Sequence, residues 1–195
     1  LETMGGPHTH MSYGSAWANL SNTPFRLYKH FTHAGGILTP FIAHWPRGIQ
    51  QPDRWVRDPA HIMDVMPTLL ELTGATYPKE HDGVAATPPE GVSLAATLRT
   101  AAALPERALC FQHEGAAAIQ KGRWKLVKGK RFPAEAQWEL YDVQADPVEL
   151  HDLAAKQPTL VKSLAAEWTA WAERTGTPTS YAPATKAGKQ KKKAG

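Results

Sequence analysis

Residues 21–37 read SNTPFRLYKHFTHAGGI, and residues 38–46 continue directly as LTPFIAHWP. The first stretch contains a polar turn, a short segment of cationic and aromatic residues, and a paired-glycine turn. The second completes an apolar run that predicts a buried strand over residues 37–45, although Pro40 favours an edge position. Ligands of α/β enzymes bind where strands of the sheet end. The stretch therefore predicts an anion-binding site in an α/β fold.

A helix is predicted next, over residues 58–74. Asp58 and Pro59 suit a cap followed by the first helical position, and Gly74 suits the stop. Apolar residues recur at helical spacing: Ile62, Val65, Met66, Leu69, Leu70 and Thr73. Pro67 lacks a backbone donor, so the helix is expected to start near it or to bend there.

A linker and then a small sheet follow. Residues 76–105 are rich in Gly, Pro, Thr and charged side chains, which predicts a domain boundary near residue 105. Short apolar or alternating runs then predict four strands of an antiparallel sheet, with a tight hairpin turn at Lys121-Gly122: residues 108–112, 116–120, 124–128 and 138–142.

One long helix is expected to cover this sheet, from Pro158 to about Arg174, with Gly176 ending it. It carries an apolar stripe of Val161, Leu164, Trp168 and Trp171. The two tryptophans could instead form a ligand platform, but at this spacing we interpret them as core residues.

The bulk composition is that of a globular protein, with 195 residues, 42% hydrophobic and 21% charged. No apolar run reaches the roughly 20 residues that a membrane span needs, so we expect no membrane segment. The net charge of +4 comes from a lysine-rich stretch near residues 186–193. We interpret that stretch as a solvated tail, with no nucleic acid as a partner.

The single cysteine and the aspartates near residues 142–152 do not match a known metal-binding pattern. Cys110 is the only cysteine, which excludes an internal disulfide and a thiolate cluster, and its apolar neighbours favour burial. Asp142, Asp146 and Asp152 suggest a calcium loop, but they lack the glycine and the closing glutamate of an EF-hand. Turn-forming and capping roles explain them better.

The first seven residues contain no charged leader and no apolar core, and the chain does not begin with methionine. We therefore expect a piece cut from a longer protein.

Four stretches together resemble one family. They are residues 22–36, residues 61–74, GRWKL at 122–126, and WELYD at 138–142 followed by Asp-Pro and Asp-Leu pairs. In this order they resemble the C-terminal portion of an arylsulfatase, a type I sulfatase of the alkaline phosphatase superfamily. The resemblance covers residues from about 12 to 175.

This resemblance implies an α/β fold of the alkaline-phosphatase-like sulfatase type. The expected domains are the end of the large α/β domain at 1–75, a linker at 76–105, a small antiparallel sheet with a packed C-terminal helix at 106–175, and a disordered basic tail at 176–195.

The resemblance also implies site residues. Lys29 matches the family lysine that contacts the sulfate ester. Arg26 is a weaker candidate for that contact and fits a structural ion pair better, whereas His113 and Glu114 are candidates for lining the substrate pocket. Ala34 stands where the family usually has glutamate.

In the complete enzyme the family uses calcium and a formylglycine made within a C/S-x-P-x-R motif. The residues after Cys110 do not match that motif, so the modified residue is not expected in this chain. The family's metal motif, usually Asp-Asn-Gly just before the stretch that opens this sequence, is missing as well, so the metal ligands are not expected either.

The predicted function is that of a C-terminal fragment of an arylsulfatase, which hydrolyses sulfate esters when complete and is inactive alone. The substrate would be a sulfate-ester small molecule or a sulfated glycan, and the family alone suggests a periplasmic or secreted location. Two alternatives stay open: a degenerate, non-catalytic sulfatase-like module, and a phosphoester or phosphonate hydrolase of the same superfamily.

Overall fold

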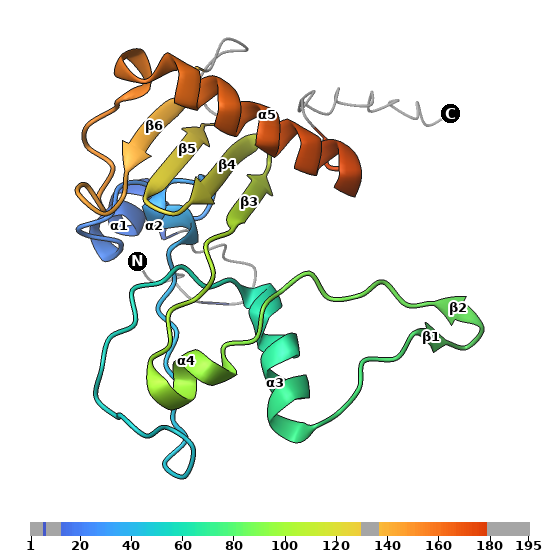
Figure 1. Ribbon diagram of the computed structural model, residues 1–195. Helices are drawn as coiled ribbons and strands as arrows, with labels where there is room; N and C mark the ends of the chain where they lie inside the picture. The colour runs from blue at the N-terminus through green and yellow to red at the C-terminus, as the bar shows by residue number, and fades with distance from the viewer. Residues whose placement is uncertain (1–5, 7–12, 130–136, 179–195) are drawn as a thin grey trace, which may run out of the picture. The chain divides into compact units, whose positions relative to one another are not determined.

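The computed structural model describes Gly6 and residues 13–129 and 137–178. The chain forms two compact units, one of residues 1–38 with 108–195 and one of residues 39–107 (Figure 1). We call them the sheet unit and the middle unit and describe each by itself. The domain bounds expected from the sequence refer to the complete enzyme, so they stay a prediction.

The sheet unit is built on a four-stranded antiparallel sheet in the order β3-β4-β5-β6. Its strands are β3 Ala108–His113, β4 Ala116–Lys121, β5 Trp124–Lys128 and β6 Glu139–Asp142. All four predicted strands are confirmed. The pairing of Lys121 with Trp124 places the second hairpin turn at Gly122-Arg123, one residue beyond the prediction.

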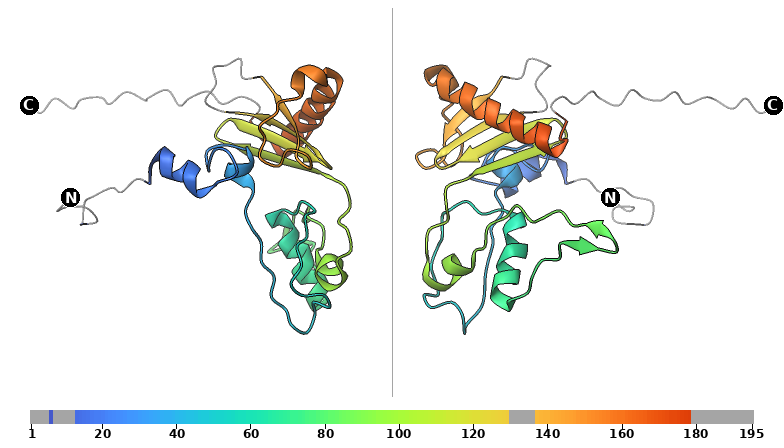
Figure 2. Two further views of the ribbon diagram at one scale, coloured as in Figure 1. Left: turned by 90° about the vertical axis from the view of Figure 1, so that its left-hand side faces the viewer. Right: turned by 45° about the vertical axis from the view of Figure 1, so that its right-hand side comes forward.

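Helix α5, Pro158–Thr175, lies across one face of this sheet (Figure 2). Proline occupies its first turn, and Gly176 ends it with a φ of 68°, as predicted. Its buried residues Leu164, Trp168 and Ala172 pack against Ala117, Ile119, Leu126 and Leu140. The indole Nε1 of Trp168 donates to the Phe111 carbonyl at 3.1 Å. Trp168 is therefore a core residue and not a ligand platform.

The opposite face of the sheet carries the N-terminal segment, with helices α1, Gly14–Ser21, and α2, Ala34–Ile37. Because side chains alternate along a strand, Ala118, Val127 and Tyr141 point to this face. The hydroxyl of Thr32 donates to the Ala117 carbonyl at 2.9 Å. The sequence motif thus packs directly on the small sheet.

The middle unit contains a single-turn 3-10 helix η1, Ile62–Asp64, and helices α3, Val65–Thr73, and α4, Ala95–Thr100. It also has a short hairpin of β1, Glu80–His81, and β2, Val84–Ala85. The segment predicted as a linker, residues 76–105, thus contains this hairpin and α4, and its role as a linker in the complete enzyme stays a prediction. Within the described parts of the chain, no helix is long and apolar enough to cross a membrane.

The predicted helix at 58–74 forms, but it begins later than expected. His61 and Asp64 make a capping box, so η1 starts at Ile62, and α3 follows with Pro67 in its first turn. Asp58 caps nothing and instead accepts a hydrogen bond from the Leu104 backbone at 2.8 Å. Gly74 ends α3 with a φ of 70°, as predicted.

The buried strand predicted over residues 37–45 is wrong for this chain. Ile37 ends α2, the following residues have no regular structure, and the side chains of Phe41 and Ile42 are 65% and 89% exposed. A strand needs a neighbour to satisfy its backbone groups, and within the described residues no strand pairs with this segment. The basic tail predicted to be disordered lies, from residue 179 on, outside the described residues.

Candidate functional site

The motif at residues 22–36 is shaped by its own backbone contacts. The Asn22 side-chain amide donates to the carbonyls of Leu27 and Gly35, at 2.9 Å each, and so ties the two ends together. A Cβ atom at Gly35 would collide with the Leu27 carbonyl, and one at Gly36 with the Phe31 carbonyl. The paired glycines, expected as a turn, form part of the short helix α2. Only glycine lets the backbone of this helix lie so close to the two carbonyl groups.

Arg26 is bound to the small sheet. Its guanidinium donates to the Tyr141 hydroxyl at 3.0 Å and to the Glu149 carbonyl at 2.8 Å, and it lies 3.7 Å from a Glu139 carboxylate oxygen. All three contacts are made by Nη1, which ties the guanidinium to the small sheet. The geometry supports the structural interpretation of Arg26 over direct sulfate contact.

Glu139 is the acidic centre of this contact. Its carboxylate lies 3.3 Å from His33 Nε2 and accepts a hydrogen bond from the Tyr141 hydroxyl. Burial by itself raises the pKa of Glu139, but the bonds from His33 and Tyr141, with the charge of Arg26, hold that pKa below its usual value. Burial and the neighbouring Glu139 raise the pKa of Tyr141. Glu139 is therefore anionic and Tyr141 neutral at neutral pH.

Glu149 forms a second, fully buried link, which the sequence analysis missed. One carboxylate oxygen accepts the Ala34 backbone N–H at 2.8 Å, and the other accepts from the Lys125 ammonium. The side chains of Lys125 and Glu149 are 3% and 0% exposed. Burial lowers the pKa of Lys125, and the adjacent carboxylate opposes that shift. The motif backbone at Ala34 is thus fixed by a carboxylate from a distant loop.

The three aspartates considered for calcium have structural roles. Asp142 accepts from the backbone of Gln144 and Ala145, and Asp146 from that of Leu150 and His151. Asp152 accepts from the backbone of Leu140 and Ala154. Asp142 also pairs with Arg123, which holds the pKa of the aspartate below its usual value. Each aspartate thus accepts bonds that form a turn or a cap, and among the described residues these three do not form a group that could hold a metal ion.

Lys29 lies in the same loop as Arg26, but its side chain is not bound to the small sheet. Its side chain is exposed, and no hydrogen bond or ion pair among residues 13–129 and 137–178 holds it. The backbone on either side is fixed by the Asn22, Arg26 and Thr32 contacts. A rigid loop therefore presents a cation to solvent.

His113 and Glu114 lie against the residue next to Lys29. His30 Nδ1 is 3.0 Å from a Glu114 carboxylate oxygen, and the rings of His30 and His113 stack with centroids 6.3 Å apart. Glu114 and Gly115 both have positive φ, 48° and 88°, and form the turn between β3 and β4. We call Lys29, His30, His113 and Glu114 the motif surface. His30 was not predicted, because only the fold brings it against His113 and Glu114.

The environment of Cys110 is that of an unreactive thiol. Cys110 lies in the middle of β3, packed against the core, and burial raises the pKa of its thiol to about 11.

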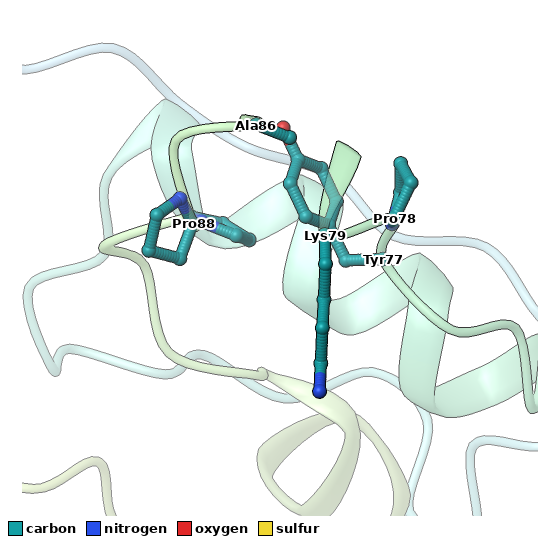
Figure 3. A pocket seen from close by; sticks show the side chains of 6 residues that line it. Tyr77, Pro78, Lys79, Ala86 and Pro88 are labelled. Atoms are coloured by element: carbon teal, nitrogen blue, oxygen red, sulfur yellow. The ribbon is translucent and has the colours of Figure 1, made fainter. Parts of the chain in front are cut away.

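A hollow of about 350 Å³ in the middle unit is lined by Tyr77, Pro78, Lys79, Ala86, Pro88 and Pro89 (Figure 3). It is wide open to solvent and contains none of the predicted site residues. Lys79 is its one charged lining residue, so the hollow lacks the convergent polar groups of a catalytic site.

The sheet unit therefore consists of a motif loop fixed on an antiparallel sheet that a C-terminal helix covers. Residues 25–171 match the family model described as N-sulphoglucosamine sulphohydrolase, C-terminal, and the chain belongs to this family.

The chain is also similar to individual sulfatases. It is 30% identical over 183 residues to an uncharacterised sulfatase of Schizosaccharomyces pombe, covering 92% of this chain and 33% of the relative. It is 36% identical over 96 residues to an arylsulfatase of Klebsiella aerogenes, covering 49% of this chain and 20% of the relative. The chain thus spans a third or less of the length of these relatives.

Among solved structures, the fold is similar to that of BT33336S-sulf, described in connection with the metabolism of multiple glycosaminoglycans by Bacteroides thetaiotaomicron. The TM-score is 0.60 at 24% identity, over 75% of this chain and 31% of that one. The predicted fold, the C-terminal part of an alkaline-phosphatase-like sulfatase, is confirmed.

Proposed function

We propose that this chain supplies the C-terminal part of an enzyme that hydrolyses sulfate esters, and that Lys29 binds the sulfate group. The observation that carries the proposal is the contrast within one loop. Arg26 is bound to Tyr141 and Glu149, whereas Lys29 is exposed on a backbone held on both sides.

The chemistry of lysine suits this role. An ammonium is a compact charge with three donors, and it stabilises the oxygens on which charge grows as the S–O bond breaks. Because the loop is already ordered, little reorganisation is needed when the substrate arrives.

Two further groups complete the reaction in the proposed enzyme. As the family resemblance implies, a formylglycine would supply the nucleophile and a calcium ion would supply positive charge when bound. Cys110 is half-buried in β3 and outside any C/S-x-P-x-R motif, and Asp142, Asp146 and Asp152 bind backbone groups, so these described residues fit neither role. Both groups are therefore assigned to the rest of the complete enzyme, and the chain alone is expected to be inactive.

His113 and Glu114 are proposed to line the substrate pocket. Both lie on the motif surface beside the residue that follows Lys29, and an imidazole with a carboxylate can hydrogen-bond sugar hydroxyls. Arg26 is assigned to positioning and does not touch the substrate.

The names of the matching family and relatives suggest two classes of substrate. The family description names a sulphoglucosamine, which favours a sulfated sugar or glycan, whereas the Klebsiella relative favours an aryl sulfate. The non-catalytic alternative is not favoured, because the lysine and the loop that presents it are both intact.

The test is hydrolysis by the complete protein of matched esters of one alcohol, a sulfate and a phosphate, together with sulfated glucosamine oligosaccharides. Inorganic sulfate should be released faster than phosphate, and residues 1–195 alone should release neither. Preference for the phosphate ester would favour the phosphoester hydrolase, and no turnover of any ester by the complete protein would favour the non-catalytic module.

A further inference from the structure

Three side chains of the motif surface converge on one point. His30, His113 and Glu114 each offer one ligand atom, and these atoms all lie within 4.8 Å of one another. We infer that His30, His113 and Glu114 form a binding site for a divalent transition-metal cation, with Zn²⁺ as the ion that fits best.

The distances approach those of a zinc site. Zinc binds imidazole nitrogen and carboxylate oxygen at about 2.0–2.2 Å, so two ligands at tetrahedral positions lie about 3.3 Å apart. His30 Nδ1 and the Glu114 oxygen are already 3.0 Å apart. The His113 nitrogen lies within 4.8 Å of both atoms, and its exposed ring would have to turn toward them to reach this separation.

The ligand types select the class of cation. Two imidazoles and one carboxylate suit zinc and its neighbours copper and nickel, whereas calcium and magnesium prefer sets made only of oxygen. Three protein ligands leave a fourth position for water or another oxygen ligand.

The three ligands are held by ordered elements. His113 ends β3, and Glu114 occupies the tight turn that follows it. His30 precedes the buried Phe31 and Thr32, and its ring also meets Tyr28 edge-on at 6.2 Å. Binding would therefore require only side-chain adjustment, which favours useful affinity.

The experiment is a Zn²⁺ titration of the purified 195-residue chain in competition with a chromogenic chelator. We expect one tightly bound ion per chain. His113→Ala and Glu114→Gln should each weaken that binding at least tenfold. His113 is exposed and glutamine keeps the shape of Glu114, so both variants should keep the far-UV circular dichroism of the parent.

The matched control is His151→Ala, because His151 is an exposed imidazole 3.4 Å from the Asp146 carboxylate, away from the three ligands in sequence. It should leave the affinity unchanged. A second control, replacing His8 and His10 together by alanine, tests another histidine pair of the chain. Zn²⁺ binding that survives in His113→Ala and Glu114→Gln, that is lost in the His8 and His10 variant, or that is absent altogether would overturn the inference.

The inference does not rest on the proposed sulfatase activity, since the titration measures equilibrium binding by the chain itself.

Discussion

The sheet unit and the middle unit bury different kinds of groups. The sheet unit packs Ile119, Leu126, Leu140 and Trp168 into one apolar core between a sheet and a helix. In residues 39–107, all of which the structure describes, the buried hydrophobic residues are Leu94 and Ala95. The sheet unit therefore contains the apolar partners that bury its own core, and the middle unit does not.

Polar contacts organise the middle unit instead. The fully buried Asp64 accepts from Arg107, from the His61 backbone at 2.7 Å and from the Val92 backbone at 2.9 Å. Large apolar side chains of the same unit are exposed, among them Phe41, Ile42, Trp55, Ile62, Met66 and Leu69. Such exposure is typical of a surface that packs against further protein. We therefore expect the sheet unit to be stable by itself, whereas the middle unit needs a partner surface to cover its exposed apolar side chains.

The largest expected effect is on the core of the sheet unit. Trp168→Ala should lower the free energy of unfolding of this unit by about 3–5 kcal/mol, because a large buried ring leaves a cavity. Hydrogen exchange in the intact chain is the measurement: amides of β4 and β5 should lose protection, and those of α3 should not.

Trp17→Ala is the matched control, since Trp17 is exposed, and it should change stability by less than about 0.5 kcal/mol. A loss below about 1 kcal/mol in Trp168→Ala would show that the ring is not a core element.

A smaller effect is expected from breaking the buried ion pair. Glu149→Gln leaves the Lys125 ammonium without its counter-charge, although the amide oxygen can still accept from Ala34. We expect a loss of about 3 kcal/mol in the unfolding free energy of the sheet unit, at the low end for a broken buried pair.

The control for that substitution is Glu167→Gln, which breaks the exposed pair with Lys121 and should cost less than about 1 kcal/mol. Equal effects of the two substitutions would show that burial of the Glu149 pair does not matter.

The smallest of these stability effects concerns the middle unit. Asp64→Asn should cost about 1–3 kcal/mol at neutral pH, because it weakens charge-assisted bonds to Arg107. Burial alone raises the pKa of Asp64, but the bonds from Arg107, His61 and Val92 hold that pKa below its usual value.

The contribution of Asp64 is thus complete above the unfolded pKa of about 3.9 and is lost as the pH falls through the lower folded value. Urea unfolding at a series of pH values, followed by exchange at α3 amides, measures it. Asp64→Asn should flatten the acid limb below about pH 4, and an unchanged limb would contradict the assignment.

The sequence was sufficient where local pattern and tertiary packing agree. Alternating residues and turn glycines predicted all four strands of the small sheet, and the stripe around Trp168 predicted the helix that covers them. The prediction of a strand at 37–45 was wrong because an apolar run indicates only that a segment tends to be buried. It does not indicate that a neighbouring strand is available to pair with it. Within the described residues, Phe41 and Ile42 find no such neighbour.

The site was predictable only in part. Residue type and resemblance selected Lys29, His113 and Glu114, but nothing in the local pattern links Glu149 to Ala34, which lie 115 positions apart. His30 was passed over because a histidine beside a lysine has no meaning until β3 and its turn are packed against it. Long-range pairs of this kind come from the fold and not from periodicity.

One loop carries two cations for which we propose different tasks: Arg26 holds the loop on the small sheet, and Lys29 binds sulfate. The most direct test is the rate constant of sulfate-ester hydrolysis by the complete protein carrying Lys29→Ala or Arg26→Ala, together with the melting temperature of each variant. We expect Lys29→Ala to lower kcat by about 10²–10³ with an unchanged melting temperature, as loss of one oxyanion donor does.

Lys29→Arg should rescue poorly, because the planar guanidinium places its donors elsewhere. Arg26→Ala should lower the melting temperature and affect kcat less per folded molecule. Turnover within about threefold of the parent in Lys29→Ala, with turnover abolished in a folded Arg26→Ala protein, would contradict the claim and give the sulfate contact to Arg26.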